Sequence, residues 1–359
     1  MSDVIVIGGG VAGLSAAAAL SADLSVTLLE REAHCGTHAS GRSAAMFEEN
    51  YGSPSTVALN KASKPAHIET GGGYLSPRGF LIIARAAEKE AFEKDAEDLG
   101  ANPVSIDAAC EILPILDRRV VALAAYRAEA YDIDTDRLLQ DLRRKIQTAG
   151  CRIVTKAPVS AIQRTSTGWR LTAGGRRYTT PILVNAAGAW ADEIARLAGL
   201  PPLGITPHRR SMARIAAPGG RDVTSWPMFF GTGETWYAKP DAGALIVSPA
   251  DEDPLPPQDA WADDLVLAEG LDRYAAMVTE PVTRMLSNWA GLRSFAPDRA
   301  LVLGPDPLDS AFVWSAGQGG YGFQTAPAAA ALVADLILGR KAQLPAETLA
   351  ALTPDRLRA

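Results

Sequence analysis

A glycine-rich turn near the start of the chain has the spacing of a phosphate-binding loop. Residues 8–13 read Gly-Gly-Gly-Val-Ala-Gly and match the pattern G-x-G-x-x-G. The apolar run 4–7 before the turn is typical of a buried parallel strand, and the alanine- and leucine-rich stretch 11–20 predicts a helix after it. Such a turn lets a pyrophosphate approach the backbone N–H groups and the positive end of the helix.

An acidic residue stands where the ribose of a dinucleotide would need an acceptor. A second apolar strand is predicted over 24–29 and ends at Glu30, which lies 20 residues after Gly10. A carboxylate at this place accepts hydrogen bonds from ribose hydroxyls and favours an unphosphorylated ribose. Strand, turn, helix, strand and acid follow in this order, so the sequence predicts a dinucleotide site. NAD and FAD both remain open at this point.

Two more turns of small residues follow predicted buried strands. The strand 181–184 runs into residues 185–190, Asn-Ala-Ala-Gly-Ala-Trp. Near the C-terminus, strands over 300–303 and 312–315 lead to residues 317–322, Gly-Gln-Gly-Gly-Tyr-Gly. Turns without large side chains let the backbone approach further parts of a dinucleotide, so these segments are expected beside the first turn.

The remaining segments predict two interleaved domains. A helix is expected to begin near Pro327, because proline is favoured at the first helical position. Another helix is predicted over 136–149, and short alternating strands over 152–178. Most of the Trp, Tyr and Pro residues lie between the nucleotide-type segments. We therefore assign residues 1–70, 136–204 and 286–345 to a discontinuous dinucleotide-binding domain, 71–135 and 205–285 to a substrate-binding domain, and 346–359 to a C-terminal tail.

The composition is that of an ordinary folded protein. Of 359 residues, 47% are apolar and 21% are charged, which argues against a disordered chain, and the net charge of −6 argues against a nucleic-acid-binding surface. No apolar run approaches the roughly 18 residues of a membrane-spanning helix, and no secretory signal is recognisable. The three scattered cysteines favour a cytoplasmic location, and the four histidines show no metal-ligand spacing.

Six stretches together resemble the D-amino-acid oxidase superfamily of FAD enzymes. They are residues 8–13, 30–32, 38–45, 185–190, 289–293 and 318–322. The first is shared by many dinucleotide-binding proteins, whereas the last three in combination are far more specific. Within the superfamily the chain is most similar to bacterial D-amino-acid dehydrogenases of the D-arginine dehydrogenase type. The resemblance implies an α/β fold (α+β overall), with a Rossmann-like FAD-binding domain interleaved with a β-sheet-based substrate-binding domain.

The resemblance selects FAD over NAD and places its isoalloxazine between the two domains. Residues 37–45 are rich in small and hydroxylic side chains, which suits a loop laid along pyrophosphate and flavin. A helix opening at 319–322 would direct its positive end to the flavin pyrimidine edge, where reduced flavin carries negative charge. The expected cofactor-binding residues are Gly8, Gly10, Val11, Ala12, Gly13, Glu30, Arg31, Thr37, Ser40, Gly41, Arg42, Ser43, Ala44, Ala45, Val159, Ala187, Gly188, Trp190, Gly319, Gly320, Tyr321, Gly322, Phe323 and Gln324.

The same resemblance bears on how the flavin is attached. His38 lies in a loop where some relatives carry a histidyl–flavin bond, but the D-arginine dehydrogenase type holds FAD without one. No cysteine lies near the C-terminal glycine loop, where sarcosine oxidases carry theirs. We therefore expect dissociable, non-covalent FAD.

The reaction implied by the family is hydride transfer from a substrate Cα to flavin N5. The product is an imino acid that hydrolyses to a 2-oxo acid and ammonia. A bidentate guanidinium suits the substrate carboxylate, and Arg293 is the first candidate and Arg210 the second, although either could be an ordinary sheet-edge arginine. The Gly320 carbonyl would accept from the amine. The expected catalytic residues are Tyr51, Arg210, Tyr237, Arg293, Gly320 and Gln324.

The side-chain pocket is expected to differ from that of the D-arginine type. There a glutamate follows a Leu-Ser-Pro-Arg stretch, whereas here residues 75–78 are followed by Gly-Phe. The expected pocket residues are Met46, Glu48, Phe80, Met228 and Phe230. A mostly apolar pocket disfavours a charged guest, so apolar or aromatic D-amino acids are expected to react better than D-Arg and D-Lys. Glu48 is either solvated or, if its stretch is helical, turned into the pocket.

Several alternatives remain open from the sequence. The enzyme could oxidise glycine, sarcosine or another N-alkyl amino acid. A non-catalytic flavin-binding protein would be favoured by loss of the arginine clamp, but both arginines are present. An NAD(P)-linked reductase usually carries a second G-x-G-x-x-G, which this chain lacks. The electron acceptor is expected to be a quinone, a dye-like carrier or oxygen.

Overall fold

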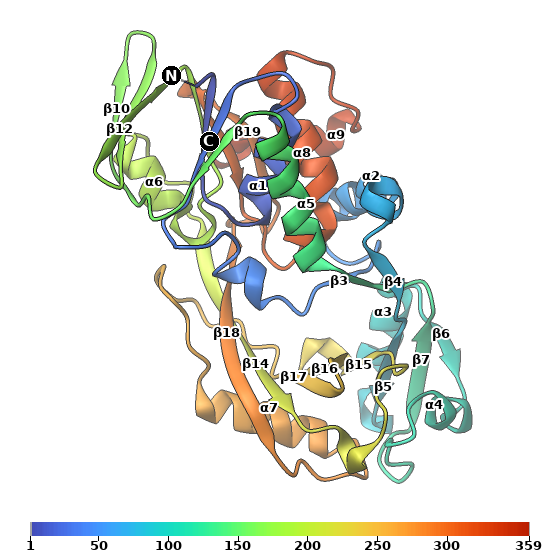
Figure 1. The fold of residues 1–359 in the computed structure, drawn as a ribbon. Helices are drawn as coiled ribbons and strands as arrows, with labels where there is room; N and C mark the ends of the chain where they lie inside the picture. Colours follow the sequence, from blue (N-terminus) through green and yellow to red (C-terminus); the bar gives the residue numbers. More distant parts are fainter. Residues whose placement is uncertain (1, 359) are drawn as a thin grey trace.

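The computed structural model describes residues 2–358 and arranges them in two parts stacked end to end (Figure 1). The first part is built on a six-stranded sheet with the order β19-β20-β13-β1-β2-β9, in which only β19 is antiparallel to its neighbour. Its strands are β1 (Val4–Ile7), β2 (Val26–Leu29), β9 (Arg152–Val154), β13 (Ile182–Asn185), β19 (Val302–Asp306) and β20 (Asp309–Ala316).

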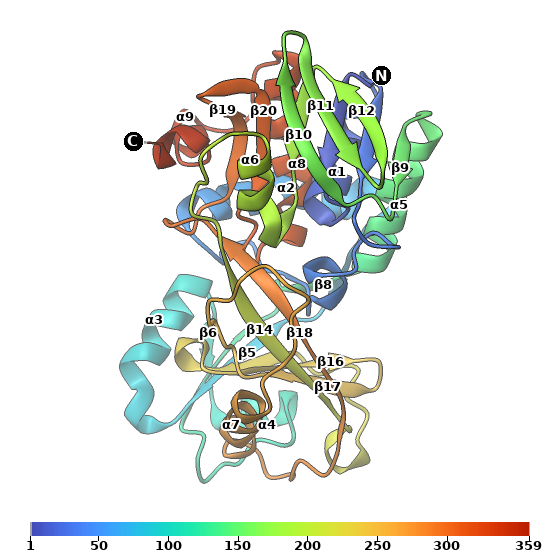
Figure 2. The ribbon, with the colours of Figure 1, turned by 90° about the vertical axis from the view of Figure 1, so that its left-hand side faces the viewer.

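The apolar runs of this sheet are continuous because both of its faces are covered. Val4 and Val6 of β1 pack with α1 (Val11–Leu20), α5 (Thr135–Thr148) and α8 (Gly322–Leu338). Ile5 and Ile7 pack on the other face, against β10 (Val159–Thr165), β11 (Gly168–Ala173), β12 (Arg176–Thr180) and α6 (Ala191–Leu197). Helices, parallel sheet and three-stranded antiparallel sheet thus form three layers (Figure 2). This is the α/β, Rossmann-like arrangement that the sequence predicts.

The second part is an eight-stranded sheet with the order β18-β14-β17-β16-β15-β5-β7-β6. One face packs against α4 (Ile106–Ile112) and α7 (Asp264–Ala275). The opposite face carries Phe80 and Phe230 and is partly covered by α3 (Lys89–Leu99). The strands are β5 (Phe80–Ala84), β6 (Asn102–Val104), β7 (Leu123–Arg127), β14 (Thr206–Ile215), β15 (Met228–Gly231), β16 (Tyr237–Asp241), β17 (Ala244–Ser248) and β18 (Met285–Phe295).

Two long strands and one small sheet connect the parts. β14 and β18 pair antiparallel from Thr206 with Phe295 to Ile215 with Met285, and both run from the first part into the second (Figures 1 and 2). The segment 286–295, which the sequence assigns to the FAD-binding domain, is therefore an edge strand of the substrate sheet. The small sheet consists of β3 (Met46–Phe47), β8 (Tyr131–Ile133) and β4 (Leu75–Pro77).

The C-terminal region differs from its prediction at the start of its helix. Helix α8 begins at Gly322 and contains Pro327 in its interior, so the proline does not mark the first helical position. The C-terminal segment assigned as a tail contains α9 (Ala346–Ala350) and the buried Leu352, whose carbonyl accepts from the Leu303 N–H at 2.8 Å. None of the helices within residues 2–358 combines the length and apolar character needed to cross a bilayer.

Candidate functional site

A single cavity of about 880 Å³ extends from the glycine turn after β1 to the paired strands β14 and β18. Of all the residues predicted to bind cofactor or substrate, only Gly13 and Gly41 do not line it. The interleaved segments are therefore brought together around one space. An apolar-lined cleft between two sheets, with a few polar groups directed into it, is the usual form of a cofactor site.

The glycine turn depends on close backbone contacts. Gly8 has a φ of +108°, and a Cβ built on it would lie 2.3 Å from the Ala186 carbonyl oxygen. A Cβ on Gly13 would lie 1.9 Å from the Gly8 oxygen, so Gly13 serves the packing of α1 on the turn and need not contact a ligand. Gly41 has the same kind of role, because its Cβ would lie 2.3 Å from the Gly36 oxygen.

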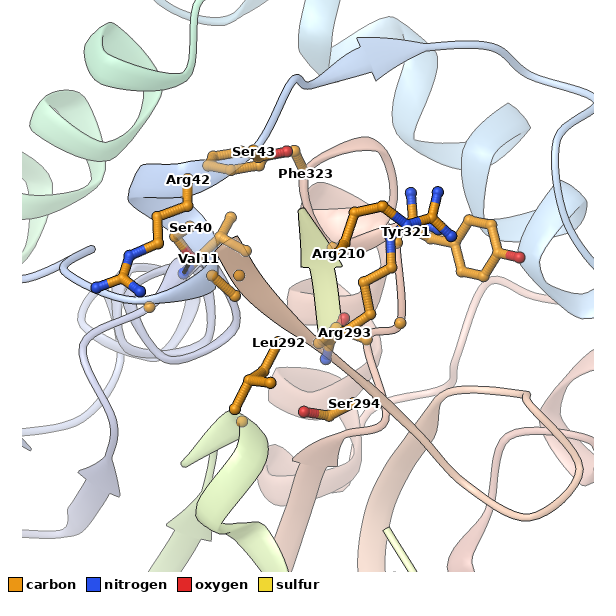
Figure 3. Close-up of a pocket in the computed structure, with 18 of the residues that line it drawn as sticks. Val11, Ser40, Arg42, Ser43, Arg210, Leu292, Arg293, Ser294, Tyr321 and Phe323 are labelled. Carbon is orange, nitrogen blue, oxygen red and sulfur yellow. Dashed lines mark hydrogen bonds between the residues drawn. The ribbon is translucent and has the colours of Figure 1, made fainter. Parts of the chain in front are cut away.

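The Glu30 carboxylate is buried at the end of β2 and is held by two backbone donors. The Gly9 N–H donates to its Oε2 at 2.6 Å and the Glu32 N–H to its Oε1 at 2.8 Å. On the other side of the turn, the Val11 N–H donates to Ser40 Oγ at 2.9 Å, and the two residues lie side by side in Figure 3. The first turn of α1 and the loop after β2 thus form one polar cradle, with an acid at its far end.

Arg42 lies differently from the expectation of a residue along the pyrophosphate. Its guanidinium donates to the carbonyls of Ala260 and Ala290 at 3.1 and 2.9 Å and pairs with Asp259 at 2.5 Å. In Figure 3 it is turned away from Arg210 and Arg293. Arg42 lines the cavity but anchors the loop before α7 and strand β18.

The guanidinium donors of Arg293 in β18 are not used in hydrogen bonds within the described residues. Its guanidinium packs against Gly320, where a Cβ would lie 2.8 Å from the arginine Cζ, and its side chain makes no hydrogen bond to any of residues 2–358. The nearest carboxylate is that of Glu252, at 3.6 Å. By contrast, buried Arg210 donates to Glu252 Oε1 at 3.0 Å and to the Asp251 carbonyl at 2.9 Å. Of the two predicted clamp residues, Arg293 is the one free to bind an anion.

Tyrosine hydroxyls and an apolar wall lie around this guanidinium. Tyr51 packs on Tyr321 with ring centroids 5.1 Å apart, and both lie in the lining together with Tyr237. Burial raises the pKa of the Tyr51 hydroxyl, so it is a neutral donor. The Tyr237 hydroxyl donates to Met212 Sδ at 3.4 Å. Four apolar side chains, Met46, Phe80, Met228 and Phe230, form the adjoining wall, with Phe80 and Phe230 centroids 5.6 Å apart.

Comparison with known proteins gives the family. The family model described as FAD dependent oxidoreductase (DAO) matches residues 3–336. The chain belongs to the DAO family. FAD-dependent oxidoreductase domain-containing protein 1 of Bos taurus is 28% identical over 94% of this chain and 81% of its own length. The structure of L-proline dehydrogenase from P. horikoshii superposes with a TM-score of 0.85 at 22% identity, covering 99% and 98% of the two chains. Glycine oxidase from Geobacillus kaustophilus gives 0.82 at 23%, covering 96% of each.

FAD, the cofactor of the DAO family, fits the residues that line the cavity. The cradle of Gly8 to Ser40 borders the cavity with backbone and small side chains, and Glu30 lines it where ribose hydroxyls would bind. At the other end of the cavity, Gln318 Nε2 is buried and has no hydrogen-bond partner among residues 2–358. Such an unsatisfied donor is expected where a ligand supplies the acceptor. FAD would therefore lie along the cavity from the first turn of α1 toward residues 318–324.

In this DAO-family chain, α2 (Pro54–Glu69) fixes the turn that carries Glu48 and Tyr51. Asn60 of α2 is fully buried, and its Nδ2 lies 3.3, 3.4 and 3.0 Å from the carbonyls of Glu48, Glu49 and Tyr51. The sequence analysis expected Glu48 to face the pocket only if its stretch were helical. The stretch is not helical, so that expectation of a helix is wrong. Glu48 is nevertheless buried and lines the cavity, because Met46 and Glu48 share one side of an extended segment.

Replacing Asn60 with alanine is expected to loosen this turn. Three carbonyls lose their shared donor, and we expect a loss of roughly 1–3 kcal/mol in the free energy of unfolding. The KM for substrate should rise several-fold while FAD content stays unchanged. Urea unfolding, flavin absorbance and steady-state kinetics check this, with Asn288→Ala on exposed β18 as the control. Equal KM values for Asn60→Ala and wild type would contradict the assigned role.

The start of α8 is fixed by the same helix. Pro327 has no N–H to donate into the first turn of α8, and the Ala328 N–H donates to Ser63 Oγ at 3.1 Å. The Gln324 carbonyl is thus open to His67 Nε2, at 3.0 Å. Gln324 itself accepts from the Glu48 N–H at 2.6 Å through Oε1. These contacts of the first residues of α8 therefore hold the glycine loop and the Glu48 turn in one arrangement.

Glu48 should make stability depend on pH. Burial raises its pKa from 4.5 to about 7, against the opposing Asn50 N–H and Arg127 charge. Between these values the folded protein binds more protons than the unfolded chain, so the free energy of unfolding falls as pH rises. Glu48→Gln removes this pH dependence. Between pH 4.5 and 7.5 the free energy of unfolding of wild type should fall by about 3 kcal/mol relative to that of the variant. Urea unfolding at several pH values, with exposed Glu129→Gln as the control, measures it; parallel curves would contradict it.

Lys239 is a cavity residue that the sequence analysis missed. It lies in β16, is 9% exposed, and its Nζ donates to the Ala44 carbonyl at 2.6 Å and pairs with Asp132 at 2.7 Å. A lysine next to a proline in a short strand is usually solvated, so no local signal distinguishes Lys239. It ties the substrate sheet to the loop expected along the flavin, in which Ala45 has a φ of +20°.

Proposed function

We propose that the protein oxidises D-amino acids with apolar or aromatic side chains to imino acids, which hydrolyse to 2-oxo acids and ammonia. The observation that carries this proposal is the free, enclosed guanidinium of Arg293 beside an apolar wall. A guanidinium that makes no hydrogen bond to the described residues suits a carboxylate ligand, and a bidentate pair fixes the orientation of the atoms next to it. The structural likeness to amino-acid enzymes supports this class of substrate.

The residues divide the work of binding. Arg293 holds the substrate carboxylate, and the Tyr51 hydroxyl donates to the same group. The Gly320 carbonyl accepts a hydrogen bond from the substrate amine. This contact orients the amine so that the nitrogen lone pair is directed to the reacting carbon. Bound FAD supplies the acceptor for the hydride that leaves Cα. An amine that arrives neutral needs no strong base.

A glycine- or sarcosine-type oxidase is the alternative. The likeness to glycine oxidase supports it, but Met46, Phe80, Met228 and Phe230 form a wall that a substrate without a side chain would leave uncontacted. We therefore expect larger side chains to gain kcat/KM through burial of apolar surface, about 25 cal/mol for each Å².

Anaerobic flavin bleaching near 450 nm tests the proposal. The panel comprises D- and L-Phe, D- and L-Leu, D-Met, D-Arg, glycine, N-methylglycine and a 2-hydroxy acid. We expect bleaching with D-Phe, D-Leu or D-Met at lower concentrations than with any other member. Faster reduction by L-isomers, by glycine or by the hydroxy acid would overturn the assignment. Oxygen consumption on the reactive substrates then separates oxidase from dehydrogenase.

A further inference from the structure

A buried ion pair lies behind the side-chain pocket. Glu48 lines the cavity, and Arg127 of β7 lies directly behind it, with Nε 3.5 Å from Glu48 Oε2. The side chains of both residues are at most 10% exposed. Neither the Glu48 Oε2 nor the Arg127 Nε has a hydrogen-bond partner within residues 2–358. The two charges thus compensate each other at a distance too long for a hydrogen bond.

Other charged groups around the pair are already occupied. Arg127 Nη1 donates to the Leu99 carbonyl at 2.6 Å, and its Nη2 lies 3.6 Å from Glu49. Glu49 in turn pairs with Lys64 at 2.9 Å. The Asn50 N–H donates to Glu48 Oε1 at 3.0 Å. Glu48 is therefore the carboxylate of this cluster that lines the cavity and keeps one oxygen without a hydrogen bond, and Arg127 is the cation nearest to that oxygen.

We propose that Arg127 determines substrate specificity by neutralising Glu48, and so prevents the side-chain pocket from accepting a cationic substrate. An ammonium group at the end of a substrate would have to share Glu48 with a buried guanidinium and would meet its positive charge. Without Arg127, the same carboxylate would become a partner for the ammonium group. Because Arg127 does not line the cavity, it acts through Glu48 as a positioning residue. The inference rests on the proposed function, since it concerns the side chain of an amino-acid substrate.

Two pairs of ligands, each differing by one terminal ammonium group, test this. The size difference within a pair is the same for every variant, so the change of a ratio between variants reports the charge. D-lysine differs from D-norleucine by a terminal ammonium in place of a methyl hydrogen, and 6-aminohexanoate differs from hexanoate in the same way. The second pair lacks the α-amine and reports binding alone, through perturbation of the flavin absorbance of the holoenzyme. The first pair reports kcat/KM. Measurements at pH 8.5 keep Glu48 ionised in the wild type.

Wild type is expected to prefer D-norleucine and hexanoate. In Arg127→Met, the kcat/KM for D-lysine divided by that for D-norleucine should rise at least tenfold. The Kd of 6-aminohexanoate divided by that of hexanoate should fall by a similar factor. The double variant Glu48→Gln, Arg127→Met should lose this gain. Exposed Arg119→Met, which removes a cation elsewhere in the same part, should leave both ratios at the wild-type value. Unchanged ratios in Arg127→Met, or a gain that persists in the double variant, overturn the inference.

A second variant covers the case in which Arg127→Met does not fold. Glu48→Gln leaves Arg127 without its carboxylate partner. This variant should disfavour D-lysine and 6-aminohexanoate even more strongly than wild type does. It should favour D-2-aminoadipate, whose side chain ends in a carboxylate. The absence of these changes also overturns the inference. If wild type binds hexanoate but oxidises no amino acid, the proposed function fails while the binding ratios still decide the role of Arg127. If neither hexanoate nor 6-aminohexanoate binds, the inference fails.

Discussion

Arg293→Met is expected to lower kcat/KM by tens- to thousands-fold while FAD stays bound. The change removes a charge-assisted bidentate contact to a carboxylate in an enclosed site, a loss of about 2–5 kcal/mol. Methionine keeps much of the apolar stem, so the packing of β18 should survive. KM and Kd should rise more than kcat falls, because the carboxylate is bound in both the ground state and the transition state.

Arg299→Met is the matched control for this variant. Arg299 also pairs with Glu252, at 2.9 Å, but it lies outside the cavity lining. Its loss should leave kinetics within about twofold, since an exposed ion pair contributes little. Steady-state kinetics on the best substrate and the flavin-to-protein ratio of both variants complete the test. Normal substrate binding by Arg293→Met would remove the clamp assignment and with it the main support for an amino-acid substrate.

Gly13→Ala is expected to yield protein that no longer retains FAD. The added Cβ would be placed 1.9 Å from the Gly8 oxygen, and a backbone atom cannot swing aside as a side chain can. Helix α1 would have to move off the turn, which disturbs the cradle between Val11 and Ser40. Overpacking of this kind costs about 1–3 kcal/mol, and we expect at least the upper end.

Gly175→Ala separates the clash from simple backbone strain. Gly175 has a φ of +74° but nothing within 4 Å of an added Cβ, so only a conformational cost of about 1 kcal/mol is expected. Flavin absorbance after gel filtration and the melting temperature compare the two variants. Full FAD content in Gly13→Ala would mean that the turn tolerates displacement of α1, and the cradle would then need another explanation.

The sequence predicts the nucleotide-binding part well because its signals are local. The run 4–7, the turn 8–13 and Glu30 lie within a single strand–helix–strand unit, whose geometry follows from consecutive residues. The helix predicted over 136–149 is present as Thr135–Thr148 for the same reason. The helix start was predicted wrongly at Pro327 because a proline at the first helical position and a proline a few residues inside a helix look alike in sequence. The difference lies in Ser63 and His67 of another helix.

The substrate end was predictable only in outline, because its charges are set by pairing across distant segments. Arg210 and Arg293 look equivalent in sequence, and the loop carrying Glu252 decides which one is free. Glu48 lies 3.5 Å from Arg127 of β7, although the two residues are 79 positions apart along the chain. Neither residue carries a local sign of this contact. Periodicity and motif spacing cannot report which charges neutralise each other after folding.

The interleaving of the two parts has a consequence for how the molecule melts. The chain enters and leaves the eight-stranded sheet more than once, and β14 and β18 belong to both parts along their length. Neither part is a continuous segment, so neither can be cut out and refolded alone, and loss of one removes the strand ends that anchor the other. Heating should therefore give one cooperative transition. A ligand bound only at the glycine turn would raise the melting temperature of the first part and that of the distant substrate sheet by the same amount.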